Sequence, residues 1–211
     1  MSRIKKATYT SLLFLVYLTV YTAIQYFVQK NDLTLWTTLD ASIPFMPEFV
    51  WLYHTLPLSI FMVMVCFIQS RHLFMVTFWA CIIACAAMSI LHISFPVFYP
   101  REDFLVFNAH EYLLHLTQQL DAASNTFPSG HVAFSWLMYF AARQTKMARE
   151  WPTVSYVFML WAIGISLSTL VIKQHFVVDV LSGWFTAALS FYTAKLFIVE
   201  QRTSALVTGE G

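Results

Sequence analysis

Long stretches without a charged residue constrain this chain more than any other feature of its sequence. Five of them have no Asp, Glu, Lys or Arg, and they cover residues 7 to 29, 49 to 70, 72 to 100, 122 to 142 and 152 to 172. A sixth stretch, residues 174 to 199, contains only Asp179 and Lys195. A helix needs about 20 predominantly apolar residues to cross a bilayer, whereas a helix of a soluble domain carries polar residues on its outer face. The sequence therefore predicts an all-α integral membrane protein, a six-helix bundle.

Composition supports a single membrane domain. Hydrophobic residues make up 59% of the 211 and charged residues only 11%, a balance that excludes an ordinary soluble domain. No repeat or Gly/Ser linker interrupts the chain, so we expect one domain over residues 1–211. No small-residue cleavage site follows the first stretch, which we expect to remain as a helix. The cysteines Cys66, Cys81 and Cys85 lie within the stretches and are expected to act as small apolar side chains.

A short string with a histidine opens the fourth stretch. Pro128-Ser129-Gly130-His131 follows the polar residues Asn125 and Thr126, a pattern typical of the start of a helix. Gly130 permits close backbone approach, and the free amides of a helix start bind phosphate well. His131 at this position could donate a proton to a leaving oxygen.

A second histidine precedes the sixth stretch. His175 and Asp179 are four residues apart, so both lie on one face of a helix. The carboxylate can accept a hydrogen bond from one ring nitrogen and leave the other nitrogen more nucleophilic. These residues predict metal-independent phosphoryl transfer through a phosphohistidine, with Arg101 and Lys173 balancing charge on the phosphorus.

The distribution of basic residues predicts the orientation of the bundle. With a cytoplasmic N-terminus, six spans leave only Lys30, Arg101 and Lys173 outside. The other nine lysines and arginines are then inside: Arg3, Lys5, Lys6, Arg71, Arg143, Lys146, Arg149, Lys195 and Arg202. Because Lys and Arg concentrate on the cytoplasmic side, both termini should be cytoplasmic and both histidine motifs should face outward, toward the periplasm if the membrane is a bacterial inner membrane. Leu113, Leu116 and Leu120 on the same side predict a short periplasmic surface helix.

The three motif segments together resemble the membrane branch of the type 2 phosphatidic acid phosphatase superfamily. The family pattern KxxxxxxRP, PSGH and SRxxxxxHxxxD is matched by Arg101, by the string ending in His131, and by Ser168 with His175 and Asp179, over roughly residues 40 to 185. The resemblance implies that His175 is the nucleophile, that Asp179 orients it and that His131 protonates the leaving group. It also implies that phosphate is held by Arg101, Ser129, Gly130 and Ser168.

The chain departs from this pattern at three positions. Ser94 stands where the family has lysine, Glu102 where it has proline, and Thr169 where it has arginine. Two cations are therefore missing. Lys173, two residues before the expected nucleophile, is predicted to replace one of them in the phosphate pocket.

A more specific resemblance concerns the acceptor of the phosphoryl group. Ser168-Thr169-Leu170 followed by Lys173-Gln174-His175, with Ile43 to Pro47 and Tyr53 upstream, is similar to the inositol phosphorylceramide synthase-like subgroup. That subgroup includes transferases that pass a phospho-headgroup to a lipid alcohol, as well as phosphatase-like bacterial chains. We expect a lipid phosphatase without a cofactor. A headgroup phosphotransferase and a non-catalytic lipid-binding relative are the alternatives.

The remaining residues have simpler interpretations. The histidines outside the motifs match no pattern and are expected to be structural: His54, His72, His92, His110 and His115. They also lack the spacing of a zinc site, so no metal is expected. Arg101 and Lys173 could instead anchor lipid headgroups, and Ser129 or Ser168 could bond only its own helix. The dispersed basic residues exclude nucleic acid as a partner and leave a lipid phosphate and membrane lipids.

Overall fold

The structure is a computed structural model that describes residues 1–28, 33–121 and 123–208, with 199–208 described by their backbone alone. Lys30 and the side chain of Arg202, both part of the charge argument, lie outside this description. Within it every regular element is a helix, and the only strand-like pairing is an isolated bridge between Phe98 and Ser124. The all-α prediction is confirmed for these residues.

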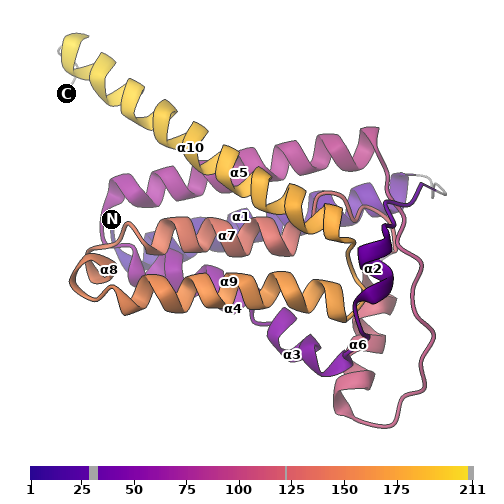
Figure 1. The fold of residues 1–211 in the computed structure, drawn as a ribbon. Coiled ribbons are helices and arrows are strands. Elements are labelled where there is room, and N and C mark those ends of the chain that lie inside the picture. Colours follow the sequence, from indigo (N-terminus) through magenta and orange to yellow (C-terminus); the bar gives the residue numbers. More distant parts are fainter. Residues whose placement is uncertain (29–32, 122, 209–211) are drawn as a thin grey trace.

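The helices differ greatly in length (Figure 1). The long ones are α1 (Arg3–Phe27), α5 (Arg71–Ser94), α9 (Thr153–Val171) and α10 (Val177–Thr208). Shorter helices connect them or pack among them: α2 (Thr38–Ser42), η1 (Pro47–Phe49), α3 (Val50–Tyr53), α4 (Leu56–Phe61), η2 (Met62–Phe67, a π-helix), α6 (Ala109–Leu120), α7 (Gly130–Ala142) and α8 (Lys146–Glu150).

Five segments of the described chain are long and apolar enough to cross a membrane. They are α1, Pro47–Phe67, α5, α9 and the Val177–Ile198 part of α10. Side chains on their outer faces are large, apolar and exposed, such as Leu15 (59%), Leu160 (64%) and Leu189 (57%). Water would make such surfaces costly, whereas hydrocarbon would not. The structure thus agrees with an integral membrane protein that has five clear spans.

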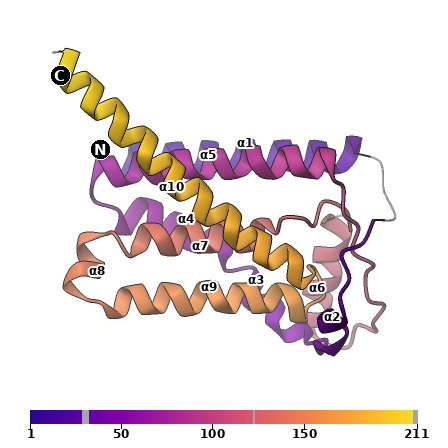
Figure 2. The ribbon, with the colours of Figure 1, turned by 45° about the horizontal axis from the view of Figure 1, so that its top comes forward.

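The fourth predicted span is shorter than its uncharged stretch. Residues 123 to 129 are not helical, because the chain runs through Pro128 and α7 begins only at Gly130, with Ser129 as its N-cap. The 13 residues of α7 cover about 20 Å, against about 30 Å of hydrocarbon. In both views of the ribbon α7 stops short of the ends of α5 and α9 (Figure 2). The six-span count therefore rests on a helix that does not reach the usual length.

The bundle is built around α7. Helix α10 packs against α5 and α7, and α7 packs against α9. Their shared core includes the fully buried Phe74, Met88, Leu137 and Met138. At one end lie α2, α3, α6 and the first turns of α7 and α10, while the N-terminus and α8 lie at the other (Figure 1). Both histidine motifs thus lie at the same end.

Helix α6 forms where the leucine spacing predicts it. Asn108 caps it by accepting a hydrogen bond from the Glu111 amide at 3.0 Å. Leu113, Leu116 and Leu120 line a cavity within the bundle. Leu113 and Leu116 are half-buried, whereas Leu120 is 85% exposed, so the stripe lies at the open edge of the cavity.

Candidate active site

The two histidine motifs are joined by a backbone hydrogen bond. The Ser129 amide donates to the carbonyl oxygen of Asp179 at 3.1 Å. Ser129 also caps α7, because its Oγ accepts a hydrogen bond from the Val132 amide at 3.4 Å. Ser129 and Asp179 are both fully buried. The first turns of α7 and α10 are therefore fixed against each other.

His175 and Asp179 form the predicted pair at the start of α10. Nδ1 of His175 lies 3.4 Å from Oδ2 of Asp179, without the alignment of a hydrogen bond. The same Oδ2 accepts a hydrogen bond from the Phe176 amide at 2.9 Å. Because Nδ1 faces the carboxylate, Nε2 of His175 is the nitrogen left for a substrate.

The ring of Phe176 helps to fix this turn. It lies 4.3 Å from the ring of Tyr99, centroid to centroid, and both residues are buried. Burial raises the pKa of the Tyr99 phenol above its usual value, with the nearby Asp40 carboxylate adding to the effect. Tyr99 therefore stays neutral and acts here as a packing residue.

His131 is held by stacking. The ring of Tyr53, on α3, lies parallel to the imidazole with centroids 3.7 Å apart and 18° between the planes. Tyr53 is 2% exposed, so its position is itself fixed by packing. At the start of α7, a Cβ on Gly130 would lie only 2.8 Å from the hydroxyl of Tyr17. Close approach of α1 to the histidine motif is thus one reason for glycine at position 130.

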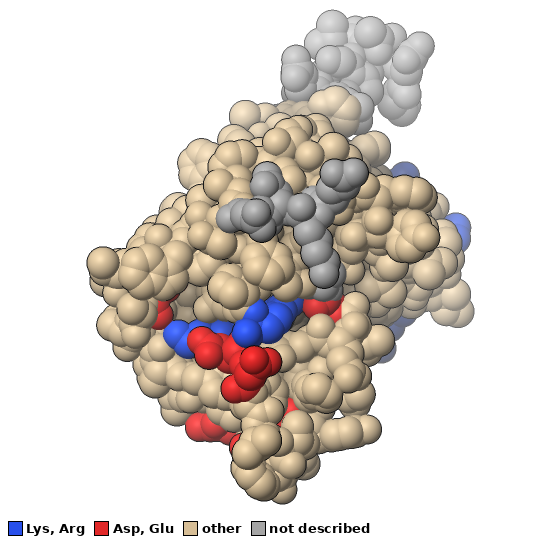
Figure 3. All heavy atoms as spheres, turned by 90° about the vertical axis from the view of Figure 1, so that its right-hand side faces the viewer, with Lys and Arg blue, Asp and Glu red and all other residues tan. Residues whose placement is uncertain are grey.

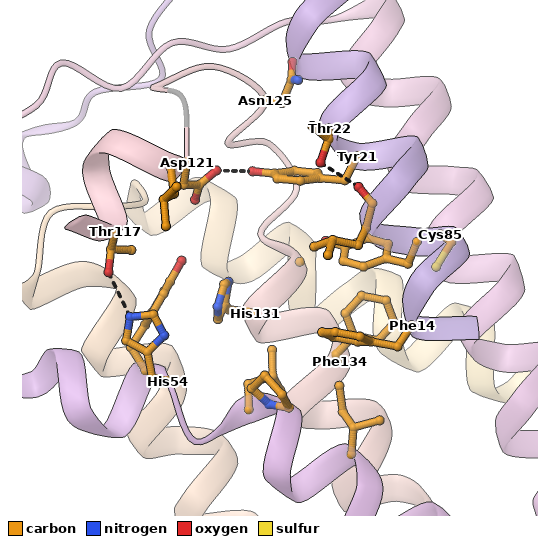
Figure 4. Close-up of a pocket in the computed structure, with 18 of the residues that line it drawn as sticks. Phe14, Tyr21, Thr22, His54, Cys85, Thr117, Asp121, Asn125, His131 and Phe134 are labelled. Atoms are coloured by element: carbon orange, nitrogen blue, oxygen red, sulfur yellow. Dashed lines mark hydrogen bonds between the residues drawn. The ribbon is translucent and has the colours of Figure 1, made fainter. Parts of the chain in front are cut away.

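A cavity of about 420 Å³ opens beside His131 (Figure 4). His175 lines the same cavity. Its wall is mostly apolar and comes from α1, α4, α5, α6 and α7, with Phe14 and Phe134 among the lining residues. An apolar cavity of this size suits part of a lipid. The site therefore combines two imidazoles with a hydrophobic compartment.

Two further histidines, expected to be structural, also line this cavity. Nε2 of His54 lies 2.8 Å from the hydroxyl oxygen of Thr117, whose proton is donated to the carbonyl of Leu113 at 2.8 Å. His54 must then be the donor through Nε2. His92 is buried and its Nε2 lies 3.4 Å from the carbonyl oxygen of Pro128, which connects α5 to the motif segment before α7.

Arg101 lies next to the turn that carries His175. Its Nη1 donates to Oε1 of Gln174, and its Nη2 donates to the backbone oxygen of Asp121 at 3.1 Å. Among the described residues it is the one arginine that contacts the residue preceding His175. The guanidinium thus spans the distance between the histidine turn and the segment that follows α6.

Lys173 does not line the cavity. Its ammonium donates to the backbone oxygens of Asp40 at 3.1 Å and Ile43 at 2.7 Å, and the residue is 8% exposed. Asp40 in turn accepts a hydrogen bond from the Val177 amide at 2.8 Å. Lys173 and Asp40 therefore clamp α2 to the two sides of the His175 turn. The predicted role of Lys173 in the phosphate pocket gains no support from this geometry.

Ser168 also lies away from the cavity wall. Its hydroxyl donates to the carbonyl oxygen of Ile165 at 2.7 Å, within α9, and the residue is fully buried. Of the predicted residues, Gly130, His131 and His175 line the cavity. Ser129 and Asp179 are joined by their backbone hydrogen bond, Asp179 contacts His175, and Arg101 contacts the neighbouring Gln174. Ser168 and Lys173 bond backbone oxygens outside the cavity lining.

Sequence reasoning missed several residues around the site. The buried Asp40 could have been noticed, because Thr37 and Asp40 form a capping box, a pattern visible in the sequence. Asp121 and Tyr21 carried no such signal, since they belong to no motif and are brought to the cavity only by the packing of α1 and α6.

One glycine outside the motifs fixes the approach of α10 to α7. A Cβ on Gly183 would lie 2.6 Å from the carbonyl oxygen of Ser129 and 3.0 Å from Cβ of Val132. We expect Gly183→Ala to destabilise the protein by about 1 to 3 kcal/mol and to lower turnover, because the backbone of α7 must shift. Thermal unfolding in detergent measures the loss of stability. Gly164→Ala is the matched control, since its Cβ would meet only the end of the Leu52 side chain; equal effects of both changes would contradict the prediction.

No group of three or more His, Cys, Asp or Glu side chains in a metal-binding arrangement occurs in the described part of the chain. Neither the curated proteins nor the solved structures include a significant match to the chain. The family model of the PAP2 superfamily matches residues 95–202, just over half of the chain, and this range contains Arg101 and both histidine motifs. The chain therefore belongs to the PAP2 superfamily.

Proposed function

We propose that the chain is an integral membrane lipid phosphatase that hydrolyses a lipid phosphomonoester or diphosphate through a phosphohistidine intermediate on His175. The observation that carries this proposal is the link between Ser129 and Asp179, which joins the two histidine motifs beside one apolar cavity. Membership of the PAP2 superfamily supports phosphatase or phosphotransferase activity.

The first chemical step forms a bond between Nε2 of His175 and phosphorus. The bond from phosphorus to the lipid oxygen breaks, and His131 donates a proton to that oxygen. The Arg101 guanidinium and the free amides at the start of α7 would stabilise the phosphoryl oxygens. In the second step His131 removes a proton from water, which attacks phosphorus and releases inorganic phosphate and free His175.

We further propose that the histidine end of the bundle faces outward, with both termini in the cytoplasm. The excess of Lys and Arg on the opposite side supports this orientation. In a bacterial inner membrane the site would then face the periplasm. Polyprenyl diphosphate, phosphatidylglycerophosphate and phosphatidic acid are the candidate substrates that follow from the family resemblance.

Transfer to a lipid alcohol is the second candidate. The size and apolar wall of the cavity favour it, because a second lipid could be held beside the histidines. Both reactions share the first step and differ only in the group that attacks the phosphohistidine.

A panel of lipid phosphates incubated with the purified protein tests both functions. We expect inorganic phosphate to be released from at least one lipid in the presence of a metal chelator. Labelled phosphate appearing in an added lipid alcohol would instead establish transfer, and neither result from any lipid would refute the proposal.

The role of His131 as proton donor makes a separate prediction. His131→Ala should lower turnover of lipid phosphates by about 10² to 10⁴-fold, because an alkoxide leaves poorly without a proton. With p-nitrophenyl phosphate, whose leaving group is stable as an anion, the loss in kcat/KM, which reports formation of the phosphohistidine, should be much smaller. Steady-state kinetics on the two substrates measure the difference, and an equal loss on both would rule out proton donation by His131.

A further inference from the structure

A second polar region lies on the cavity wall, away from His131 (Figure 4). The carboxylate of Asp121 accepts hydrogen bonds through Oδ1 from the Tyr21 hydroxyl and from Nε2 of Gln25, both at 2.6 Å. Asn125, four residues further along, lines the same cavity and lies on the far side of Tyr21 from His131 in this view. We call these four residues the Asp121 cluster.

The side chain of Asn125 is buried without a partner. The residue is 3% exposed, and neither Nδ2 nor Oδ1 has a hydrogen-bond partner among the described residues. The surrounding loop is fixed, because the Tyr99 amide donates to Ala123 at 2.8 Å and the Thr126 amide donates to Val97 at 3.4 Å. A buried amide that lacks both a donor and an acceptor partner is unfavourable unless a ligand supplies them.

The charge of the wall restricts what that ligand is. Asp121 is the only carboxylate among the described side chains that line the cavity, and none of them is Lys or Arg. A second phosphate at the Asp121 cluster would be repelled. A hydroxyl or amino group fits, because it donates to a carboxylate or an amide oxygen and its heavy atom can face the amide nitrogen.

Arg101 connects this cluster to the reacting phosphorus. The guanidinium contacts the backbone of Asp121 on one side and Gln174, next to His175, on the other. A phosphate held by Arg101 beside His175 would therefore have its neighbouring chemical group at the Asp121 cluster.

From these contacts we infer that the Asp121 cluster is a subsite for a hydroxyl or amino group adjoining the reacting phosphate of the lipid. This inference rests on the proposed function and sharpens it. Lipid phosphates with a hydroxylated headgroup, such as phosphatidylglycerophosphate, become the preferred substrates. Phosphatidic acid and polyprenyl diphosphate, which lack such a group, become poor ones.

The test compares two substrates and one variant. Asn125 has a left-handed backbone with φ of 63°, which glycine adopts without strain, so Asn125→Gly removes the amide and leaves the loop intact. We expect the wild type to favour phosphatidylglycerophosphate over phosphatidic acid in kcat/KM by about 10- to 100-fold. In Asn125→Gly this ratio should fall at least about tenfold. Asn125→Asp, which keeps the shape and removes the donor, should lower the ratio as well.

Gln118→Ala is the matched control, because its Nε2 is also buried without a partner among the described residues but Gln118 does not line the cavity. It should leave the substrate ratio unchanged. A second arm supplies labelled phosphatidic acid as donor and phosphatidylglycerol as a hydroxylated acceptor. Label transferred to phosphatidylglycerol by the wild type, and lost in Asn125→Gly, would assign the subsite to an acceptor instead of the donor headgroup.

The outcomes separate the inference from the proposed function. A wild type that hydrolyses both lipids equally and transfers no label, or a variant that keeps the wild-type ratio, would overturn the subsite and leave the phosphatase standing. A wild type without turnover of any lipid phosphate would overturn the proposed function and the subsite with it.

Discussion

His175→Ala will abolish turnover of every lipid phosphate, with a loss in kcat of about 10⁵-fold or more. Removing the proposed nucleophile removes the covalent intermediate, because Nε2 of His175, on the side of the ring away from Asp179, is the atom that would bond phosphorus. Phosphate release from the purified protein measures the loss. The wild type, quenched in acid or base during turnover of labelled substrate, should carry label that is stable in base and labile in acid, as expected for a phosphoramidate.

His115→Ala provides the control for this change. His115 is exposed on α6 and bonds only Gln119 among the described residues, so its loss should leave kcat within about twofold. Substantial turnover by His175→Ala, or a labelled protein in that variant, would show that another residue is the nucleophile.

Lys173→Met should lower turnover by about 10- to 100-fold and destabilise the protein by about 2 kcal/mol. The reason is mechanical. The Lys173 ammonium holds the carbonyls of Asp40 and Ile43, and α2 in turn holds the Val177 amide through the Asp40 carboxylate. Without the ammonium, the carbonyls of Asp40 and Ile43 lose their hydrogen-bond donor. The turn that carries His175 then loses one of its two attachments to α2.

Two measurements distinguish this anchoring role from direct contact with phosphate. Asp40→Asn should reproduce part of the loss, and the double variant should be less impaired than the sum of both effects, because the residues belong to one clamp. The inhibition constant of orthovanadate should change little. A large rise in that constant with unchanged stability would instead place Lys173 at the phosphate. Lys146→Met, at an exposed lysine paired with Glu150, is the control.

The membrane-spanning helices could be predicted because the free-energy cost of placing charge in hydrocarbon largely decides where they lie. Charge is costly in hydrocarbon, so the uncharged stretches coincide closely with α9 and overlap α1 and α5 with ends that differ by a few residues. The start of α7 was predicted by its motif and not by the uncharged stretch, because Ser129 caps the helix and Gly130 begins it. Absence of charge does not make a helix, and residues 123 to 129 are uncharged yet non-helical around Pro128.

Contacts in the site were predictable only between residues whose separation along the chain fixes their separation in space. His175 and Asp179 meet because four residues make one helical turn. The contacts of Lys173 do not follow from spacing, because its backbone has φ of 55° and its ammonium bonds the backbone of Asp40 and Ile43, more than a hundred residues away. The contacts of Tyr53 with His131 and of Tyr21 with Asp121 likewise depend on tertiary packing.

Charged side chains are scarce around the site, as expected for an active site at the surface of a membrane. The end of the bundle that carries the motifs shows few charged side chains, with basic and acidic ones adjacent near its middle (Figure 3). A bare anion in water would find little long-range attraction there. In the proposed function, recognition must then come from the whole amphiphile, through its tails as well as its phosphate.

The shortness of α7 sets the depth at which the reaction occurs. With α5 about 36 Å long and α7 about 20 Å, the first turn that carries His131 is recessed below the rim formed by its neighbours. For the proposed lipid substrate, such a recessed site would be reached by sideways diffusion within the leaflet, and the lipid would not have to be lifted out into water for its ester to be cleaved.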